Sequence, residues 1–279
     1  MLDESSTHSS IPSIQQGAAT AYALSVNTTF PQIFPPELNT QYATVILSPS
    51  TLTIPGNSTA VIRVTFSRPT MLIAARIPVF SGYINIQSSN NESLHLPYAG
   101  IGCNMKDVII TDFESRPPYV SNSSDVSAIP VPIGTNETFN VSNYLPTFNC
   151  RLVMGSSVMR LDILDGSNQT NIIGSVPDFP RYWVPRTSFA QPEDKYQTTW
   201  NGTLSTGVQV PAGRYMILYR VLKIFGDQNN NNDYENWTSP VFGIEYSIPM
   251  NISSSASYKR KVSPICFAIF WLQKLIELI

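Results

Sequence analysis

Short apolar runs broken by proline, glycine, asparagine and serine recur along the whole sequence, and this pattern constrains the fold most. Proline accounts for 22 of the 279 residues, whereas an ordinary protein has about 5%. Because a proline inside a helix removes a backbone hydrogen bond and clashes with the preceding turn, prolines spread along the chain disfavour long helices. The runs are rich in Val, Ile, Tyr, Phe and Thr, which strands prefer. The sequence therefore predicts an all-β protein.

The strand pattern falls into two groups, and the first covers residues 18–104. Apolar and polar residues alternate there, as in strands with one face buried and one face in water. Within this group Leu94 and Leu96 are expected to point inward and His95 outward. Residues 1–17 are polar and carry no periodicity, so we expect a disordered linker there.

The second group covers residues 105–250 and predicts a further β-sandwich with long loops. Its clearest strand is Gly213–Phe225, which is too apolar on both faces to lie at a sheet edge. Trp200 is expected at the rim of this sandwich. Residues 251–279 lack the strand pattern and are interpreted as an atypical tail with a short amphipathic helix. The prediction is two consecutive β-sandwiches, each with its own core.

The charge composition excludes two classes of partner. The chain has 17 Lys and Arg against 19 Asp and Glu, and its formal net charge is -2. Such a balance offers no basic surface to nucleic acid or to an anionic membrane. We therefore expect no nucleic-acid partner.

Acceptor sites for N-glycosylation are unusually frequent. Ten Asn-X-Ser/Thr sequons occur among 21 asparagines, whereas random placement would give about four. They lie at Asn27, Asn57, Asn91, Asn122, Asn136, Asn140, Asn168, Asn201, Asn236 and Asn251. Most fall between apolar runs, where a glycan would stand in water. The pattern favours a secreted glycoprotein, and a surface rich in Ser, Thr and Asn is the alternative.

The first residues do not form a signal peptide, because acidic residues come early and no apolar core follows. Either the chain remains inside the cell, or it is the C-terminal part of a longer precursor that is extracellular or attached to the cell wall; we favour the second interpretation. Cys103 and Cys150 could form a disulfide, and two free thiols are equally compatible with the sequence. Cys266 lies in the tail and is expected to stay unpaired.

The order of several motifs resembles one protein family. LSPSTLTIPGNSTAVIRVTFSRP, then PVFSGYINIQ, then LHLPYAGIG resemble the fibronectin-type-III-like domain that follows the catalytic domain of secreted subtilisin-like serine proteases, notably large fungal and bacterial ones. WNGTLSTGVQVPAGRYMILYRVLKIFGD resembles the second C-terminal β-sandwich of the same proteases. The resemblance covers about residues 20–250. It implies a first sandwich of the fibronectin type III or immunoglobulin type.

The catalytic residues of that family are not found in this sequence. A subtilisin-like enzyme needs a serine nucleophile, a histidine base and an aspartate that orients the histidine. The only histidines are His8 and His95, and neither stands in the Gly-Thr-His motif of the family, nor does any serine stand in Gly-Thr-Ser-Met. The resemblance therefore implies an accessory region that stabilises a catalytic domain and helps to position protein substrates. No catalytic residue and no cofactor is expected.

Carboxylates suggest two further kinds of site. The loop 226–235 carries oxygen ligands at alternate positions, which are Asp227, Asn229, Asn231, Asp233 and Glu235. Their spacing leaves calcium binding open, although the glycine and the terminal glutamate of a helical calcium loop are missing. Asp162 and Asp165 are three residues apart on a predicted strand, so they face opposite sides and cannot act as a glycosidase pair.

Exposed aromatic residues support a competing hypothesis. Tyr182 and Trp183 lie between two prolines, and Trp237 lies inside a sequon. They are candidates for a platform that stacks on sugars or peptides, although core filling is the ordinary role of such residues. The alternative function is an independent extracellular adhesive or glycan-binding module.

The tail remains outside the family pattern. Residues 262–279 are mostly apolar but contain Gln273, Lys274 and Glu277. This stretch is too short and too charged to span a bilayer, so we expect at most interfacial membrane contact. A mispredicted gene end would also explain the change of pattern after Pro249.

Overall fold

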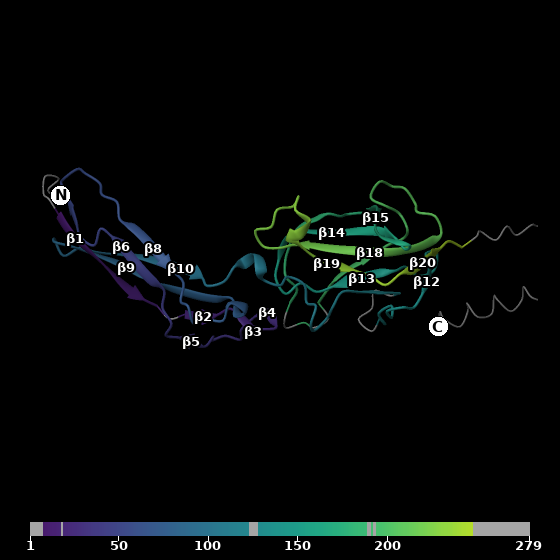
Figure 1. The fold of residues 1–279 in the computed structure, drawn as a ribbon, viewed down its shortest axis with the longest axis horizontal. Coiled ribbons are helices and arrows are strands. Elements are labelled where there is room, and N and C mark those ends of the chain that lie inside the picture. Colours follow the sequence, from purple (N-terminus) through teal and green to yellow (C-terminus); the bar gives the residue numbers. More distant parts are fainter. Residues whose placement is uncertain (1–7, 18, 123–127, 189–190, 192–193, 248–279) are drawn as a thin grey trace, which may run out of the picture. The chain divides into compact units, whose positions relative to one another are not determined.

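The computed structural model describes residues 8–17, 19–122, 128–188, 191 and 194–247. These residues form strands and three short 3₁₀ turns, η1 (Ala74–Arg76), η2 (Met105–Asp107) and η3 (Asn231–Asp233) (Figure 1), with no α-helix among them. The predicted all-β class is therefore confirmed. The described residues from His8 to Tyr246 belong to one compact unit. In the described part, no helix has the length and apolar character needed to cross a membrane.

The N-terminal part, residues 8–101, contains ten strands. They are β1 (His8–Gln16), β2 (Ala19–Ala21), β3 (Ala23–Ser25), β4 (Thr28–Pro31), β5 (Leu38–Asn39), β6 (Thr44–Ser48), β7 (Leu52–Ile54), β8 (Arg63–Ser67), β9 (Pro78–Ser88) and β10 (Ser93–Ile101). The main sheet has the order β5-β2-β9-β1-β7, and β10 pairs with β9. Two small sheets, β3-β4 and β6-β8, complete this part.

The expected linker over residues 1–17 is wrong for residues 8–16, because they form β1. This strand pairs antiparallel with β9 from Ser10 to Gln16 and with β7 from His8 to Ser10. Two of its buried positions are Ser10 and Pro12. Neither residue is of the β-branched or aromatic type that indicates a strand, so the sequence pattern did not reveal β1. Pro12 lies opposite Ile86 of β9 but beyond the residues that pair with β7, and proline is tolerated where a strand has no partner on one side.

The core of the N-terminal part is small. Ala19, Ala43 and Phe80 form one buried cluster, and Ala23 and Ile77 form a second one with Val108. On β10, Leu94 is 66% exposed and Leu96 is 57% exposed, so their predicted inward burial is wrong. Leu94 lies opposite Ile86 of β9, and Leu96 lies opposite Ile84. Among the described residues, no side chain covers the two leucines enough to bury them.

The C-terminal part, residues 105–246, contains the remaining strands. They are β11 (Tyr119–Ser121), β12 (Thr138–Asn140), β13 (Thr147–Cys150), β14 (Ser156–Asp165), β15 (Asn168–Ser175), β16 (Arg181–Val184), β17 (Tyr196–Thr199), β18 (Gly213–Leu222), β19 (Tyr234–Thr238) and β20 (Phe242–Glu245). One sheet has the order β11-β13-β17, and the larger sheet has the order β12-β20-β18-β14-β15. In the larger sheet β16 also pairs with β14, and β19 pairs with β18.

The two C-terminal sheets enclose an extensive apolar core. Phe148 of β13 meets Tyr219 of β18 with ring centroids 5.3 Å apart, so side chains of both sheets interdigitate. The central strand of the larger sheet is β18, in agreement with the prediction from its apolar faces. Trp200 is 1% exposed and belongs to this core rather than to the rim.

The two cysteines in the described part are free thiols. Cys150 is buried in the C-terminal core, whereas Cys103 is half-buried beside Met105. Cys266 and the apolar stretch 262–279 lie outside the described residues.

Candidate functional site

The asparagines of nine of the ten sequons lie in the described part of the chain, and Asn251 lies outside it. Eight of these asparagines are exposed, and Asn140 is half-buried on β12. Asn57 and Asn91 occupy turns with positive φ values of 59° and 68°, a conformation that asparagine tolerates better than most residues. The structure therefore leaves eight acceptor side chains accessible from solvent.

His95 lies on β10 with its ring exposed, as predicted from the alternation. Its Nδ1 lies 2.6 Å from Oδ1 of Asn85, and its Nε2 lies 3.4 Å from the Ser93 hydroxyl. Neither neighbour is a carboxylate, which is the group that orients the histidine in the Ser-His-Asp triad of subtilisin-like enzymes. His8 lies on β1, so the two histidines belong to different strands.

The carboxylates of the Asn-rich loop do not converge on one point. Asp233 pairs with Lys106 at 2.7 Å and accepts the backbone N–H of Asp227 at 2.8 Å. Glu235 instead accepts the backbone N–H groups of Ile110 and Thr111. Asp227 accepts the N–H of the residue two positions later, as in an Asx turn. Within the described ranges, no group of three acidic, His or Cys side chains could hold a metal ion.

Asp162 and Asp165 have separate partners, which agrees with their predicted opposite faces. Asp162 is buried, accepts the Ser175 hydroxyl at 2.6 Å and pairs with Arg220 at 2.7 Å. Asp165 accepts bonds from Ser167, which lower the pKa of its carboxyl. The Asp162 pair is a structural ion pair of the larger sheet.

The predicted aromatic platform is only partly present. Tyr182 is 59% exposed and Trp183 is 83% exposed on β16, the strand next to β14. Trp237, in contrast, packs against the core, where its ring centroid lies 5.8 Å from that of Phe148. Trp237 is therefore a structural residue and not part of a platform.

Phe225 joins Trp183, and the sequence did not predict this. The two residues line one cavity of about 550 Å³ together with Gly155, Ser157 and Ile224. Phe225 is 85% exposed because the chain leaves the sheet after Leu222, three residues before the predicted end of that strand. Both aromatic residues have positive φ values, 54° and 57°, which cost of order 1–3 kcal/mol for a residue other than glycine.

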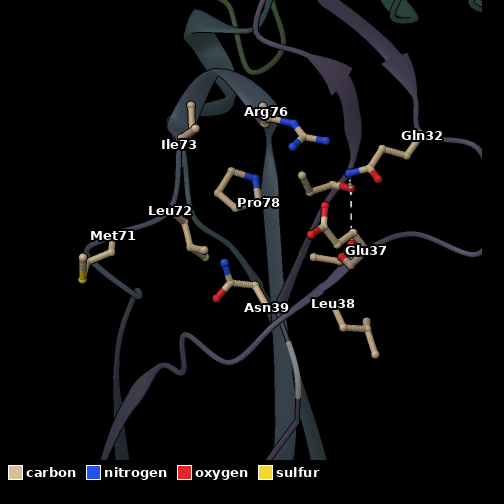
Figure 2. A pocket seen from close by; sticks show the side chains of 11 residues that line it. Gln32, Glu37, Leu38, Asn39, Met71, Leu72, Ile73, Arg76 and Pro78 are labelled. Carbon is tan, nitrogen blue, oxygen red and sulfur yellow. Dashed lines mark hydrogen bonds between the residues drawn. The ribbon is translucent and has the colours of Figure 1, made fainter.

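A smaller hollow of about 190 Å³ lies in the N-terminal part. Figure 2 shows Met71, Leu72 and Pro78 on one side of it and the Glu37 side chain on the other. Thr20 Oγ1 donates to the Glu37 carbonyl at 2.8 Å. Met71 is 77% exposed, so this hollow is a shallow surface depression.

Comparison with known proteins identifies one part of the chain. A search of curated proteins found no match. Residues 5–99 match the family model of an Fn3-like domain, which covers about a third of the chain. The match begins before residue 18, in agreement with β1 as the first strand of this sheet. The boundary expected between residues 104 and 105 stays a prediction. Residues 5–99 are thus an Fn3-like domain.

Proposed function

We propose that the chain is the non-catalytic C-terminal accessory region of a secreted subtilisin-like serine endopeptidase. The observation that carries this proposal is the Fn3-like domain at residues 5–99, a domain type that occurs in the C-terminal regions of such proteases. A second β-sandwich follows it, in the order that the sequence motifs of the family indicate.

The polar chemistry of the described residues supports a scaffold role. The His95 ring has amide and hydroxyl neighbours, and the buried carboxylate of Asp162 pairs with Arg220. These are structural arrangements, because a buried charge needs a partner. In the proposed role the two parts would bury apolar surface of the catalytic domain and help to place protein substrates.

The proposed location is outside the cell or in the cell wall. The eight exposed acceptor asparagines support it, because a glycan attached at these positions would extend into water without disturbing a core. A domain that works beside a secreted protease would need to be exported with it.

Two experiments test this proposal. First, the purified chain is incubated with casein, and no hydrolysis is expected; hydrolysis that a serine-directed inhibitor blocks would show that the chain is itself an enzyme.

Second, the genomic DNA upstream of Met1 is sequenced and expressed in frame with the chain. We expect a subtilisin-like catalytic domain whose half-life at elevated temperature falls when residues 8–247 are deleted. An upstream region without such a domain contradicts the proposal.

One observation favours a second function, a glycan-binding module. Trp183 and Phe225 expose aromatic faces around one cavity despite unfavourable backbone conformations, and such strain is concentrated at ligand sites. A glycan array tests this function with the wild type, Trp183→Ala and a control, Phe34→Ala, which changes an 87% exposed ring in the N-terminal part. Binding that only Trp183→Ala abolishes would support the glycan-binding module, and no binding would exclude it.

A further inference from the structure

A hollow of about 430 Å³ lies beside the segment that leads into the C-terminal β-sandwich. Its walls include Ile109, Phe113 and Val153, and its polar groups include Asp112, Glu114 and Glu235. Ile109 and Phe113 are 44% and 38% exposed, whereas Val153 is buried. The site therefore combines an apolar wall with three carboxylates.

Asp112 is a buried acid with an unused acceptor. Its side chain is 4% exposed, and its Oδ1 accepts the backbone N–H of Ser115 at 3.0 Å. Its Oδ2 accepts no hydrogen bond from the residues that the structure describes. Nη1 of Arg151 lies 3.7 Å from this oxygen, which makes an ion pair but is too far for a hydrogen bond. A buried acceptor of this kind is costly unless a donor reaches it.

Glu235 and Glu114 add negative charge to the same hollow. The two oxygens of Glu235 accept the backbone N–H groups of Ile110 and Thr111 at 2.8 Å and 2.9 Å, which hold the carboxylate in place. Burial raises the pKa of this carboxyl, although these two N–H groups oppose the shift. Glu114 is exposed, and its Oε1 accepts Nδ2 of Asn27 at 3.3 Å. Each carboxylate oxygen can accept a further bond.

Two basic groups near the hollow direct hydrogen bonds to backbone carbonyls. Arg151 directs Nη2 to the Ser188 carbonyl at 2.8 Å, and Lys223 directs Nζ to the Asn232 carbonyl at 3.3 Å. The carboxylates of Asp112, Glu114 and Glu235 therefore keep acceptor positions that these two hydrogen bonds do not use, and they bring negative charge to the hollow. A cation entering it would gain from this charge and from the low dielectric of the partly buried site.

The shape of the site selects among cations. A metal ion is disfavoured, because Glu235 already accepts two N–H groups and the described residues form no cluster of three ligands. A cation on an aliphatic stem fits better, since the stem can pack on Ile109 and Val153. A guanidinium group is less strongly hydrated than an ammonium group, can stack on the half-exposed ring of Phe113, and carries five donors for the carboxylates.

We propose that this hollow binds an arginine side chain of a protein partner, with Asp112 as its buried anchor and Glu114 at its mouth. The identity of the partner, a protein substrate or the catalytic domain, rests on the proposed function. The arginine site itself does not, because it is argued from the carboxylates and the apolar wall alone.

The test uses the purified full chain and the peptide acetyl-Gly-Ala-Arg-Ala-Gly-amide, with versions in which lysine, citrulline or alanine replaces arginine. Calorimetric titration measures each affinity. We expect the arginine peptide to bind about tenfold or more tightly than the citrulline peptide, because citrulline keeps the shape and removes the charge. The lysine peptide should lie between them. Equal affinities for the arginine and citrulline peptides would overturn the proposal. So would the absence of binding of any peptide at a concentration of about 5 mM, which is near the weakest dissociation constant worth measuring.

Two variants locate the binding. Asp112→Asn removes the buried charge and should weaken the arginine peptide about tenfold or more. Asp112→Asn also removes the ion-pair partner of Arg151 and could disturb the fold. Glu114→Gln therefore provides a second test at an exposed position, and it should weaken binding about threefold. The control is Glu37→Gln, which changes an exposed carboxylate of the shallow N-terminal hollow and should leave the affinity unchanged. If folded variants at Asp112 and Glu114 both bind as the wild type does, the proposed site is wrong.

The outcomes for the site and for the proposed function are separate. Peptide binding without any effect of the chain on a catalytic domain would sustain the arginine site and reject the accessory role. If the chain stabilises the catalytic domain, Glu114→Gln leaves this effect intact and no peptide binds, the accessory role is sustained and the arginine site is rejected.

Discussion

Individual residues in this protein have properties that depend on the element that buries them. The Cys150 thiol lies in the C-terminal core, where burial raises its pKa to about 12. Cys103 is half-buried, and desolvation raises the pKa of its thiol as well. The alternation of the sequence identified neither environment, because cysteine occurs in cores, in metal sites and in disulfides alike.

We expect native Cys150 to resist alkylation by iodoacetamide at pH 8, because the thiolate is the reactive form and the side chain is inaccessible. Cys103 should react faster than Cys150. Peptide mapping by mass spectrometry after timed labelling measures both, and in 6 M guanidinium chloride the two should react alike. Equal rates in the native protein, or a Cys103–Cys150 disulfide, would contradict this.

Asp233 links stability to pH. The backbone N–H of Asp227, followed by the Lys106 ammonium, lowers the pKa of the Asp233 carboxyl. A carboxyl with a lowered folded-state pKa stabilises the fold above its unfolded pKa of 3.8, and this contribution is lost as the pH falls through the folded-state pKa. Asp233→Asn should therefore lower the urea midpoint at pH 7, and the difference from the wild type should shrink below pH 4, near the unfolded pKa of aspartate.

The matched control for this prediction is Asp227→Asn. Its side chain is exposed and accepts only a local N–H in the described structure, a bond that an asparagine can also accept. A pH-independent difference for Asp233→Asn, or an equal loss for Asp227→Asn, would argue against the assigned role of Asp233.

At the scale of elements, two tryptophans on neighbouring segments have opposite environments. Trp200 follows β17, donates its Nε1–H to the Thr203 carbonyl at 2.8 Å and packs edge-on against Tyr215. Trp183, near the end of β16, is 83% exposed. Both are flanked by turn residues in the sequence, so local composition does not distinguish them.

Replacement of each tryptophan by alanine should separate these environments. Trp200→Ala should lower the free energy of unfolding by about 3–5 kcal/mol, because it opens a cavity in the core and removes the hydrogen bond to Thr203. Trp183→Ala should change it by less than about 0.5 kcal/mol, as at an ordinary surface position. Urea denaturation followed by circular dichroism measures both, and a larger loss for Trp183→Ala would refute the described packing of β16 and β17.

At the scale of the whole molecule, the two parts differ in how much apolar surface they bury. Among the described residues, the C-terminal cluster contains 22 buried residues, whereas each of the two clusters that include N-terminal residues contains three. Apolar burial is the main favourable contribution to folding, at about 25 cal/mol per Å². The N-terminal part, with Leu94 and Leu96 exposed on β10, therefore has less stabilisation of its own.

Hydrogen exchange should report this difference directly. We expect the amides of β9 and β10 to exchange faster than those of β14 and β18, because local opening costs less where few side chains are buried. Exchange measured by mass spectrometry on the intact chain at neutral pH tests it. Equal protection of β9 and β14 would show that the N-terminal part gains stability from contacts other than its own core.

The sequence by itself determined the all-β class, the central position of β18, the outward direction of His95 and the separation of Asp162 from Asp165. These follow from alternation and turn chemistry, which act between residues close in the chain. Only the tertiary structure decided that β1 joins the sheet, that Trp200 is buried while Trp183 is not, and that Asp112 and Glu235 line one hollow. These depend on which distant segments pair and cover each other, and local periodicity carries no information about partners that lie far along the chain.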